Sequence, residues 1–221
     1  MPEPLVHPRS ARDKILDCAE RLFARRGYAG VGLAEVAEAV GLSKSSLFHH
    51  FRSKTALHAA VVARILGHID QAVSAAVVAA TTPQERLDRW IDAVVDVLAA
   101  NPSYARLLLR SLFEDDELAG DTPEEAEANA ALRHMVSAAS QLLREGMLSG
   151  AFRPASVSHT LQTLIGAAVF HFASGEFGEE LCGRSVFAPS EVRRRKNELK
   201  ALVRRGLLAA PVSTARLRRN R

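Results

Sequence analysis

The strongest constraint on the fold is the stretch Gly27–Lys54, which predicts two short helices joined by a tight turn. Apolar residues recur at helical spacing before Gly41, and Leu47 and Phe51 continue that spacing after it. Gly41 allows the backbone conformation that a sharp turn needs, and Ser43 is suited to cap the helix that follows. We therefore predict a helix-turn-helix. The residues expected to hold its helices together are Val36, Ala37, Val40 and Leu47.

Helix signals continue through the rest of the chain. Thr82–Glu85 and Thr122–Glu125 both have a threonine, a proline and a glutamate at the spacing of a capping box. Gly150 and Pro154 interrupt the helical pattern, and Cys182 lies in a glycine-flanked segment that we interpret as a loop. No alternating apolar pattern of useful length indicates a strand, so the predicted fold is all-α. After a fourth helix over 54–80, we expect helices over 83–99, 102–114, 123–148, 155–172 and 190–208.

Composition and charge point to a cytoplasmic protein with one basic surface region. The first residues do not resemble a signal peptide, no apolar run reaches the length of a membrane span, and two cysteines are too few for a disulfide framework. Residues 1–55 have nine Lys and Arg against six Asp and Glu, a net charge of +3. Residues 190–221 have a net charge of +9 and residues 56–189 a net charge of −8. Only part of the surface is therefore expected to face a polyanion.

The exposed side of the predicted helix after Gly41 has hydrogen-bonding groups and no carboxylate, which suits the major groove of DNA. We expect Ser45, Ser46 and His49 to reach base edges, and Lys44, His50 and Lys54 to contact phosphates. With the ring of Phe48 included, the candidate DNA-binding residues are Lys44, Ser45, Ser46, Phe48, His49, His50 and Lys54.

These residues carry a resemblance to the TetR family of transcriptional regulators. The family's pattern is a helix ending in G-Y, an IA-x-x-AGVS-like segment and K-x-x-LY-x-HF-x-SK. The corresponding segments here are Gly27–Tyr28, Val36–Ser43 and Lys44–Lys54, within a match over about residues 10–60. Two positions differ: Val31 replaces a phosphate-binding Thr or Ser, and Phe48 replaces a Tyr whose hydroxyl binds phosphate.

The resemblance implies a DNA-binding domain over residues 1–55 and a helical ligand-binding and dimerisation domain over 56–221. It implies a repressor, a homodimer that binds a palindromic DNA operator and is released by a small apolar ligand. An activator and a regulator whose DNA binding the ligand stabilises are the alternatives, and the ligand's identity is left open. We expect the dimer to form through two apolar stripes on the last helices. The stripes are Leu161, Leu164, Ile165, Ala168 and Phe172, and Val192, Leu199, Leu202 and Val203. Candidate ligand-binding residues are Trp90, Tyr104, Phe113, His134, Met135, Phe170 and His171.

Two other functions fit the sequence less well. An enzyme acting on an acidic substrate needs an acid-base pair or a nucleophile with its base, and no such constellation is visible. A protein that binds nucleic acid without sequence preference is expected to be basic throughout, whereas the middle of this chain is acidic. The eight histidines lack the spacing of metal ligands, so no metal and no cofactor is expected.

Overall fold

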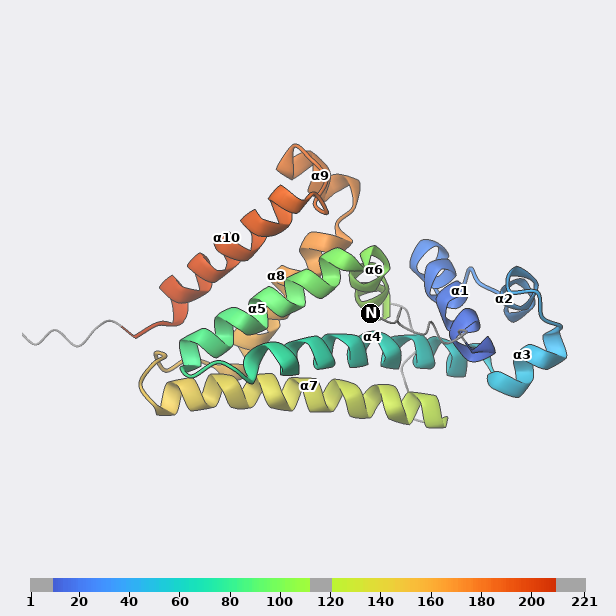
Figure 1. Cartoon of the computed structure of the whole chain (residues 1–221), viewed down its shortest axis with the longest axis horizontal. Coiled ribbons are helices and arrows are strands. Elements are labelled where there is room, and N and C mark those ends of the chain that lie inside the picture. The colour runs from blue at the N-terminus through green and yellow to red at the C-terminus, as the bar shows by residue number, and fades with distance from the viewer. Residues whose placement is uncertain (1–9, 112–120, 210–221) are drawn as a thin grey trace, which may run out of the picture.

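The computed structural model describes residues 10–111 and 121–209, and these residues form an all-helical protein (Figure 1). An isolated antiparallel bridge joins Phe152 to Leu208, and no strand forms within the described ranges. In chain order the helices are α1 (Ala11–Arg26), α2 (Leu33–Ala39), α3 (Lys44–His50), α4 (Lys54–Val77), α5 (Pro83–Ala100), α6 (Pro102–Ser111), α7 (Pro123–Leu148), α8 (Val157–Ala173), α9 (Glu176–Cys182) and α10 (Pro189–Leu207).

The helices are arranged in two groups that share α4. Helices α1, α2 and α3 gather at the N-terminal end of α4, while α5, α6 and α7 pack along the rest of it and α10 packs against α5 on the side away from α4 (Figure 1). Helix α4 lies alongside α7 and also packs against α5 and α1. One hydrophobic core runs through both groups, because buried residues of α1 such as Phe23 belong to the same cluster as Leu98 of α5.

Local capping explains most helix starts. The hydroxyls of Ser43, Ser53 and Thr122 each accept a hydrogen bond from a backbone N–H in the first turn of α3, α4 and α7. Thr122 and Glu125 form the complete predicted capping box. Thr82 also caps α5, but the carboxylate of Glu85 accepts from Thr81 instead of reaching back to Thr82, so the second predicted box is incomplete.

One predicted segment in the C-terminal part was wrong. The segment expected to be a loop around Cys182 contains the short helix α9, whose C-cap Gly183 is left-handed with φ of 68°. The other predicted helices agree with the structure to within three residues at the ends described, and α10 begins at Pro189, next to the predicted start. The predicted end of the sixth helix at residue 114 lies outside the described residues.

A row of ion pairs fixes α10 against α5. Acidic residues four apart on α5 face basic residues four apart on α10, and the two helices run antiparallel. The pairs are Asp88–Arg204, Asp92–Lys200 and Asp96–Lys196. Each such partly exposed pair contributes about 0.2–1 kcal/mol. The positive charges of Lys196, Lys200 and Arg204 are therefore paired with carboxylates of the same chain, so they are not available to bind a polyanion.

Helix α4 is long and apolar enough to cross a membrane by length and composition, contrary to the expectation that no segment reaches that length. Its position accounts for its composition in another way. Residues such as Leu57, Val61 and Ile65 are fully buried against the neighbouring helices. Helix α4 is therefore hydrophobic because it is the central helix of the bundle.

Candidate functional site: an exposed helix-turn-helix and an apolar cavity

The turn between α2 and α3 has the geometry of a helix-turn-helix. Gly41 has φ of +70°, a conformation that side-chain-bearing residues rarely adopt, so it permits the sharp turn. Val36, Ala37 and Leu47 are buried and hold α2 and α3 together, as predicted, while Val40 is half-buried against the same core. The packing leaves one face of α3 in solvent.

That face contains most of the predicted DNA-binding residues. Lys44, Ser45, Phe48, His49 and His50 are all exposed. Phe48 remains 38% exposed although it is aromatic, with the ammonium group of Lys44 5.8 Å from the centre of its ring. The accessible surface of α3 therefore offers a cation, a hydroxyl, two imidazoles and an aromatic ring, with no carboxylate.

Ser46 is the exception among the residues of α3. It is half-buried, and its hydroxyl lies 2.8 Å from the hydroxyl of Ser43, whose Oγ also accepts from the Ser46 N–H at 3.1 Å. Ser46 is therefore less accessible than its neighbours on α3, because it takes part in the cap of the helix. Ser45, whose hydroxyl lies 2.9 Å from Ser43, is nevertheless exposed.

Lys54 has a structural partner in addition to any role at the surface. Its ammonium group donates to the backbone carbonyl of Tyr28 at 3.0 Å and lies 4.1 Å from the centre of the Tyr28 ring. The Tyr28 hydroxyl is 2.8 Å from Oγ1 of Thr55. Lys54 and Tyr28 therefore join the start of α4 to the loop between α1 and α2, which fixes the orientation of the helix-turn-helix on α4.

Two further residues make the DNA-facing surface differ from the one expected from the sequence. Val31 is buried at 3% exposure, so this side chain fills the core where the resembling family has a phosphate-binding hydroxyl. Arg52 is exposed immediately after α3, although it was not among the predicted contacts. Its position between Phe51, which is buried, and the cap residue Ser53 was the signal that could have identified it.

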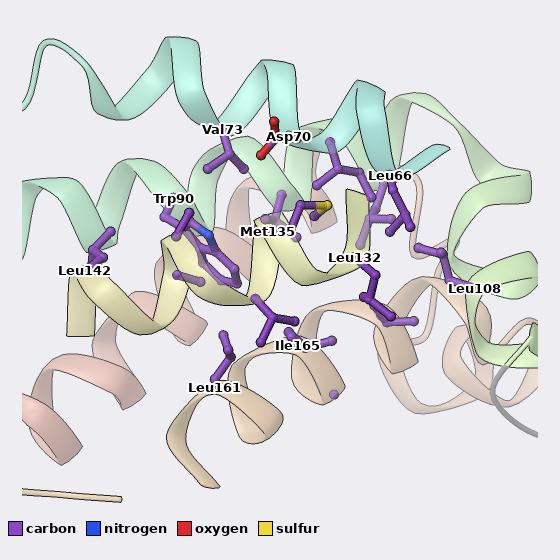
Figure 2. Close-up of a pocket in the computed structure, with 18 of the residues that line it drawn as sticks. Leu66, Asp70, Val73, Trp90, Leu108, Leu132, Met135, Leu142, Leu161 and Ile165 are labelled. Carbon is purple, nitrogen blue, oxygen red and sulfur yellow. The ribbon is translucent and has the colours of Figure 1, made fainter. Parts of the chain in front are cut away.

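A large apolar cavity lies in the second group of helices. Its volume is about 530 Å³, and its walls come from α4, α5, α6, α7 and α8 (Figure 2). This size falls within the range of small-molecule binding sites. The residues labelled in Figure 2 are Leu66, Asp70, Val73, Trp90, Leu108, Leu132, Met135, Leu142, Leu161 and Ile165.

Three of the seven predicted ligand-binding residues line this cavity: Trp90, Met135 and Phe170. Tyr104 is buried but does not line it, and His134 is exposed on the surface of α7. His171, next to Phe170, is not among the lining residues, and Phe113 lies outside the described residues. Most of the lining is aliphatic, and aliphatic residues at helical spacing do not reveal in a sequence whether they line a cavity or fill a core.

His171 is instead placed in a cationic, desolvated environment. Burial, followed by the positive charge of Arg195, lowers the pKa of His171 to about 4, while Glu191 acts weakly in the opposite direction. Nε2 of the imidazole is buried without a hydrogen-bond partner among the described residues. Arg195 itself donates to the backbone carbonyl of Ala167 at 2.6 Å and so links α10 to α8.

This environment predicts a pH-dependent stability. The unfolded chain binds a proton at His171 near pH 6.5 and the folded chain only near pH 4, so acidification through this window favours unfolding. We expect the free energy of unfolding to fall by about 1–2 kcal/mol between pH 6.5 and 4, less than the full shift implies because the ring is only partly buried. Urea titrations of the wild type and His171→Gln at several pH values measure the difference. If the free energy of unfolding changes equally with pH in the two proteins, His171 is not the group responsible for the pH dependence.

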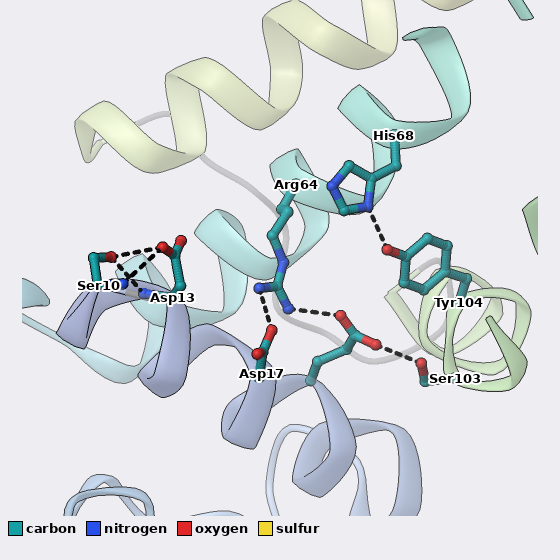
Figure 3. Close-up of polar contacts among 8 residues, drawn as sticks. Ser10, Asp13, Asp17, Arg64, His68, Ser103 and Tyr104 are labelled. Carbon is teal, nitrogen blue, oxygen red and sulfur yellow. Dashed lines mark hydrogen bonds and ion pairs between the residues drawn. The ribbon is translucent and has the colours of Figure 1, made fainter. Parts of the chain in front are cut away.

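A polar network connects the helix-turn-helix group to the cavity-bearing group (Figure 3). Arg64 of α4 donates to Asp17 and to Glu20 of α1, each at 2.7 Å. The other carboxylate oxygen of Glu20 accepts from the hydroxyl of Ser103 at the start of α6, at 2.5 Å. Three helices are thereby joined around one guanidinium group that is only 18% exposed.

A second contact lies one turn further along α4. Nδ1 of His68 and the hydroxyl of Tyr104 are 2.5 Å apart, in hydrogen-bond contact (Figure 3). Burial, with the nearby carboxylate of Glu20 as the next contribution, raises the pKa of Tyr104 to about 12, so this hydroxyl stays protonated at neutral pH. Tyr104 thus links α6 to α4.

The apolar stripes predicted to form a dimer interface are mostly buried within the single chain. Leu161, Leu164, Ala168 and Phe172 of α8 are at most 5% exposed, and Leu199 and Val203 of α10 at most 9%. Val192 is half-buried. The expectation that these stripes face a partner was therefore wrong for the buried members, because they pack against the chain's own core. Ile165 and Leu202 remain accessible, at 38% and 66% exposure.

The described residues contain no cluster of three or more His, Cys, Asp or Glu side chains suited to bind a metal ion. Cys18 is buried, and burial raises the pKa of its thiol.

The chain is similar to known proteins in both of its parts. Residues 15–61 match the model of the bacterial regulatory proteins of the tetR family, and residues 83–203 match that of the tetracyclin repressor-like C-terminal domain. An uncharacterised HTH-type transcriptional regulator of Mycobacterium tuberculosis is 36% identical over 95 residues, covering 43% of this chain and 47% of the relative. The chain thus spans about half the length of this curated relative.

Solved structures share the fold over almost the whole chain. The ketosteroid transcriptional regulator KstR2 of Mycobacterium tuberculosis has a TM-score of 0.72 at 20% identity, covering 92% of this chain and 98% of the other. FadR of Bacillus subtilis in complex with stearoyl-CoA has a TM-score of 0.66 at 17% identity, covering 86% and 96%. Since the second family model by itself matches more than half of the residues and the first matches the helix-turn-helix, the chain belongs to the TetR family.

Proposed function

We propose that this chain is a sequence-specific DNA-binding transcriptional regulator of the cytoplasm that responds to an apolar small molecule. One observation carries the proposal: a single helix connects both sites. Helix α4 begins at Lys54, four residues after the end of α3, and its residues from Leu66 to Val77 line the cavity. A ligand that changes the position of α4 therefore acts directly on the orientation of the helix-turn-helix.

Helix α6 supplies a second connection. Leu108 and Leu109 near its C-terminal end line the cavity, while Ser103 at its start is hydrogen-bonded to Glu20 of α1. Filling the cavity displaces or stabilises α6, and Ser103 and Tyr104 transmit this change to α1 and α4. We propose that the unliganded state binds the operator and represses, and that the ligand favours a state with a different spacing of the two α3 helices.

The same geometry supports a division of the chain. We propose residues 1–55 as the DNA-binding domain and residues 56–221 as the ligand-binding and dimerisation domain, with the boundary in the first turn of α4. Of the exposed residues of α3, His49 and Ser45 are assigned to base edges, and Lys44 and His50 to phosphates. Arg52 joins the phosphate contacts because it is exposed next to α3.

A homodimer is part of the proposal because two helix-turn-helix units contact a palindrome twice. The exposed faces of α8 and α10 are its proposed interface. Leu202 of α10 is an exposed apolar residue of this surface, at 66% exposure. Interfaces of this kind combine an apolar centre with a polar rim.

The apolar cavity supports a ligand of steroid or fatty-acyl size. The volume of about 530 Å³ accommodates either, and two structural relatives are described as a ketosteroid regulator and as a stearoyl-CoA complex. At 20% and 17% identity these relatives indicate the fold, so the ligand of this chain has to be found from its own cavity.

The DNA-binding assignment predicts different effects for two residues of α3. Duplexes selected from a random pool by the wild-type protein are expected to contain an inverted repeat. Lys44→Ala is expected to weaken binding to selected and random duplex alike and to reduce the salt slope by about 0.9, the value for one phosphate. His49→Ala is expected to remove about 1–3 kcal/mol of discrimination at particular base pairs.

Titrations against the selected duplex, its single-mismatch variants and random duplex at several salt concentrations test both effects. Arg133→Ala, at an exposed residue of α7 remote from α3, is the control and is expected to leave all titrations unchanged. Selection that enriches no sequence would favour the alternative of non-specific nucleic-acid binding. Mismatch penalties that survive His49→Ala but change with Lys44→Ala would reverse the assigned roles.

A further inference from the structure

The cavity wall formed by α4 contains two polar residues in otherwise apolar surroundings. Asp70 and Ser74 are four residues apart, so they lie on the same face of the helix, and both line the cavity. Among the described lining residues, Asp70 is the only one with a charged side chain and Ser74 the only one with a hydroxyl. A carboxylate in an apolar cavity wall is unfavourable unless a partner compensates it, which marks this position for a function.

Among the described residues, the negative charge of Asp70 is compensated only weakly by a neighbouring side chain. Its Oδ2 lies 3.7 Å from Nε2 of His134, beyond hydrogen-bond distance, and His134 is 69% exposed on α7. An imidazole that is so exposed interacts mainly with water. The carboxylate, which is 31% exposed, therefore keeps acceptor capacity that a molecule in the cavity can use.

Asp70 is also well placed relative to the opening. Lining residues that remain exposed, including Leu132 of α7 and Ile165 and Phe170 of α8, mark the mouth between these two helices. In Figure 2, Asp70 lies on the α4 side of the cavity, opposite Ile165 and Leu161 of α8, with Met135 and Trp90 between them. A ligand that enters between α7 and α8 thus directs its inner end toward Asp70.

We propose that the ligand is an apolar molecule whose inner end carries a hydrogen-bond donor, a hydroxyl or an amine, which donates to Asp70. An acid in the same orientation would bring a second carboxylate to Asp70, and the repulsion between the two like charges selects against it. This inference rests on the proposed function, since it assigns the ligand class of the same cavity.

The test uses the only tryptophan of the chain, Trp90, which lines the cavity and reports binding by its fluorescence. Full-length protein is titrated with decylamine, 1-decanol and decanoate, three probes with the same chain and different head groups, each below the concentration at which it aggregates. The wild type is expected to bind decylamine and decanol about tenfold or more tightly than decanoate, because a charge-assisted hydrogen bond is replaced by repulsion.

Asp70→Asn tests whether the carboxylate of Asp70 causes this order of probe affinities. The amide keeps the size of the side chain and removes its charge, so decylamine is expected to bind about tenfold more weakly and decanoate more tightly. Asp121→Asn, the same change at an exposed residue before α7, is expected to leave the order intact. Comparison of the two variants separates the effect of the charge at Asp70 on probe binding from the effect of the protein's net charge.

The outcomes distinguish this inference from the proposed function. Binding of all three probes with equal affinity, or an order unaffected by Asp70→Asn, would overturn the ligand class while leaving the cavity as a binding site. Failure of every probe to change the fluorescence of Trp90 would overturn both the ligand class and the role of the cavity as a binding site. Tightest binding of decanoate by the wild type would assign the cavity to fatty acids instead.

Discussion

A negative charge at Leu164 is expected to unfold the helical part of the protein. Leu164 is 3% exposed on the inner side of α8, so Leu164→Glu removes a buried apolar side chain and places a carboxylate in the core. Losing the burial of a leucine costs about 1.5–3 kcal/mol, and an unpaired buried polar or charged group adds several kcal/mol to that cost. The total exceeds about 4 kcal/mol, a large part of the stability of an ordinary domain. Circular dichroism during urea titration measures the loss.

Leu202→Glu is the matched variant, because the same substitution is made where the side chain is 66% exposed in the single chain. It is expected to leave the stability of the monomer within about 0.5 kcal/mol of the wild-type value. Sedimentation velocity is expected to show monomers, since the charge would be buried at the proposed interface. A folded Leu164→Glu dimer would refute the packing of α8, and an unchanged Leu202→Glu dimer would place the interface on another surface.

Gly146→Ala is expected to destabilise the protein by about 2–4 kcal/mol, although alanine normally favours a helix. A Cβ at Gly146 would lie 2.1 Å from two ring atoms of Phe152, which is itself 1% exposed. The backbone N–H of Phe152 donates to the carbonyl of Gly146 at 2.9 Å, and the ring is almost fully buried, so it has little room to move away from an added methyl group. Overpacking of such a site typically costs about 1–3 kcal/mol and occasionally more.

Gly67→Ala is the control for helix propensity. Gly67 lies inside α4 and is exposed, and a Cβ added there would meet no atom within 4 Å beyond its chain neighbours and its own helix backbone. Alanine is expected to raise the free energy of unfolding here by up to about 1 kcal/mol. Urea midpoints of the two variants that move in opposite directions would support the contact of Gly146 with Phe152. A stabilised Gly146→Ala protein would show that Phe152 does not pack on α7 as described.

The predictions from sequence that were confirmed rest on interactions between near neighbours in the chain. Ser43 caps α3, Thr122 and Glu125 form a box, and Gly41 permits the turn, each through contacts within three or four residues. The all-helical fold and the family follow from the same local patterns. The incomplete box at Thr82 fits this account, because Thr81 competes for the same carboxylate and only the folded geometry decides between them.

Only the tertiary structure determined what each apolar helix face packs against. Leu164 and Leu202 are both leucines at regular positions on helices, yet one is buried in the chain's own core and the other is exposed. Similarly, Trp90 lines the cavity while Tyr104 is held by His68, and both are aromatic residues on central helices. Helical periodicity determines that a face is apolar, but the partner of that face depends on how helices distant in sequence pack together. The cavity and the carboxylate of Asp70 in its wall exist only as a result of that packing.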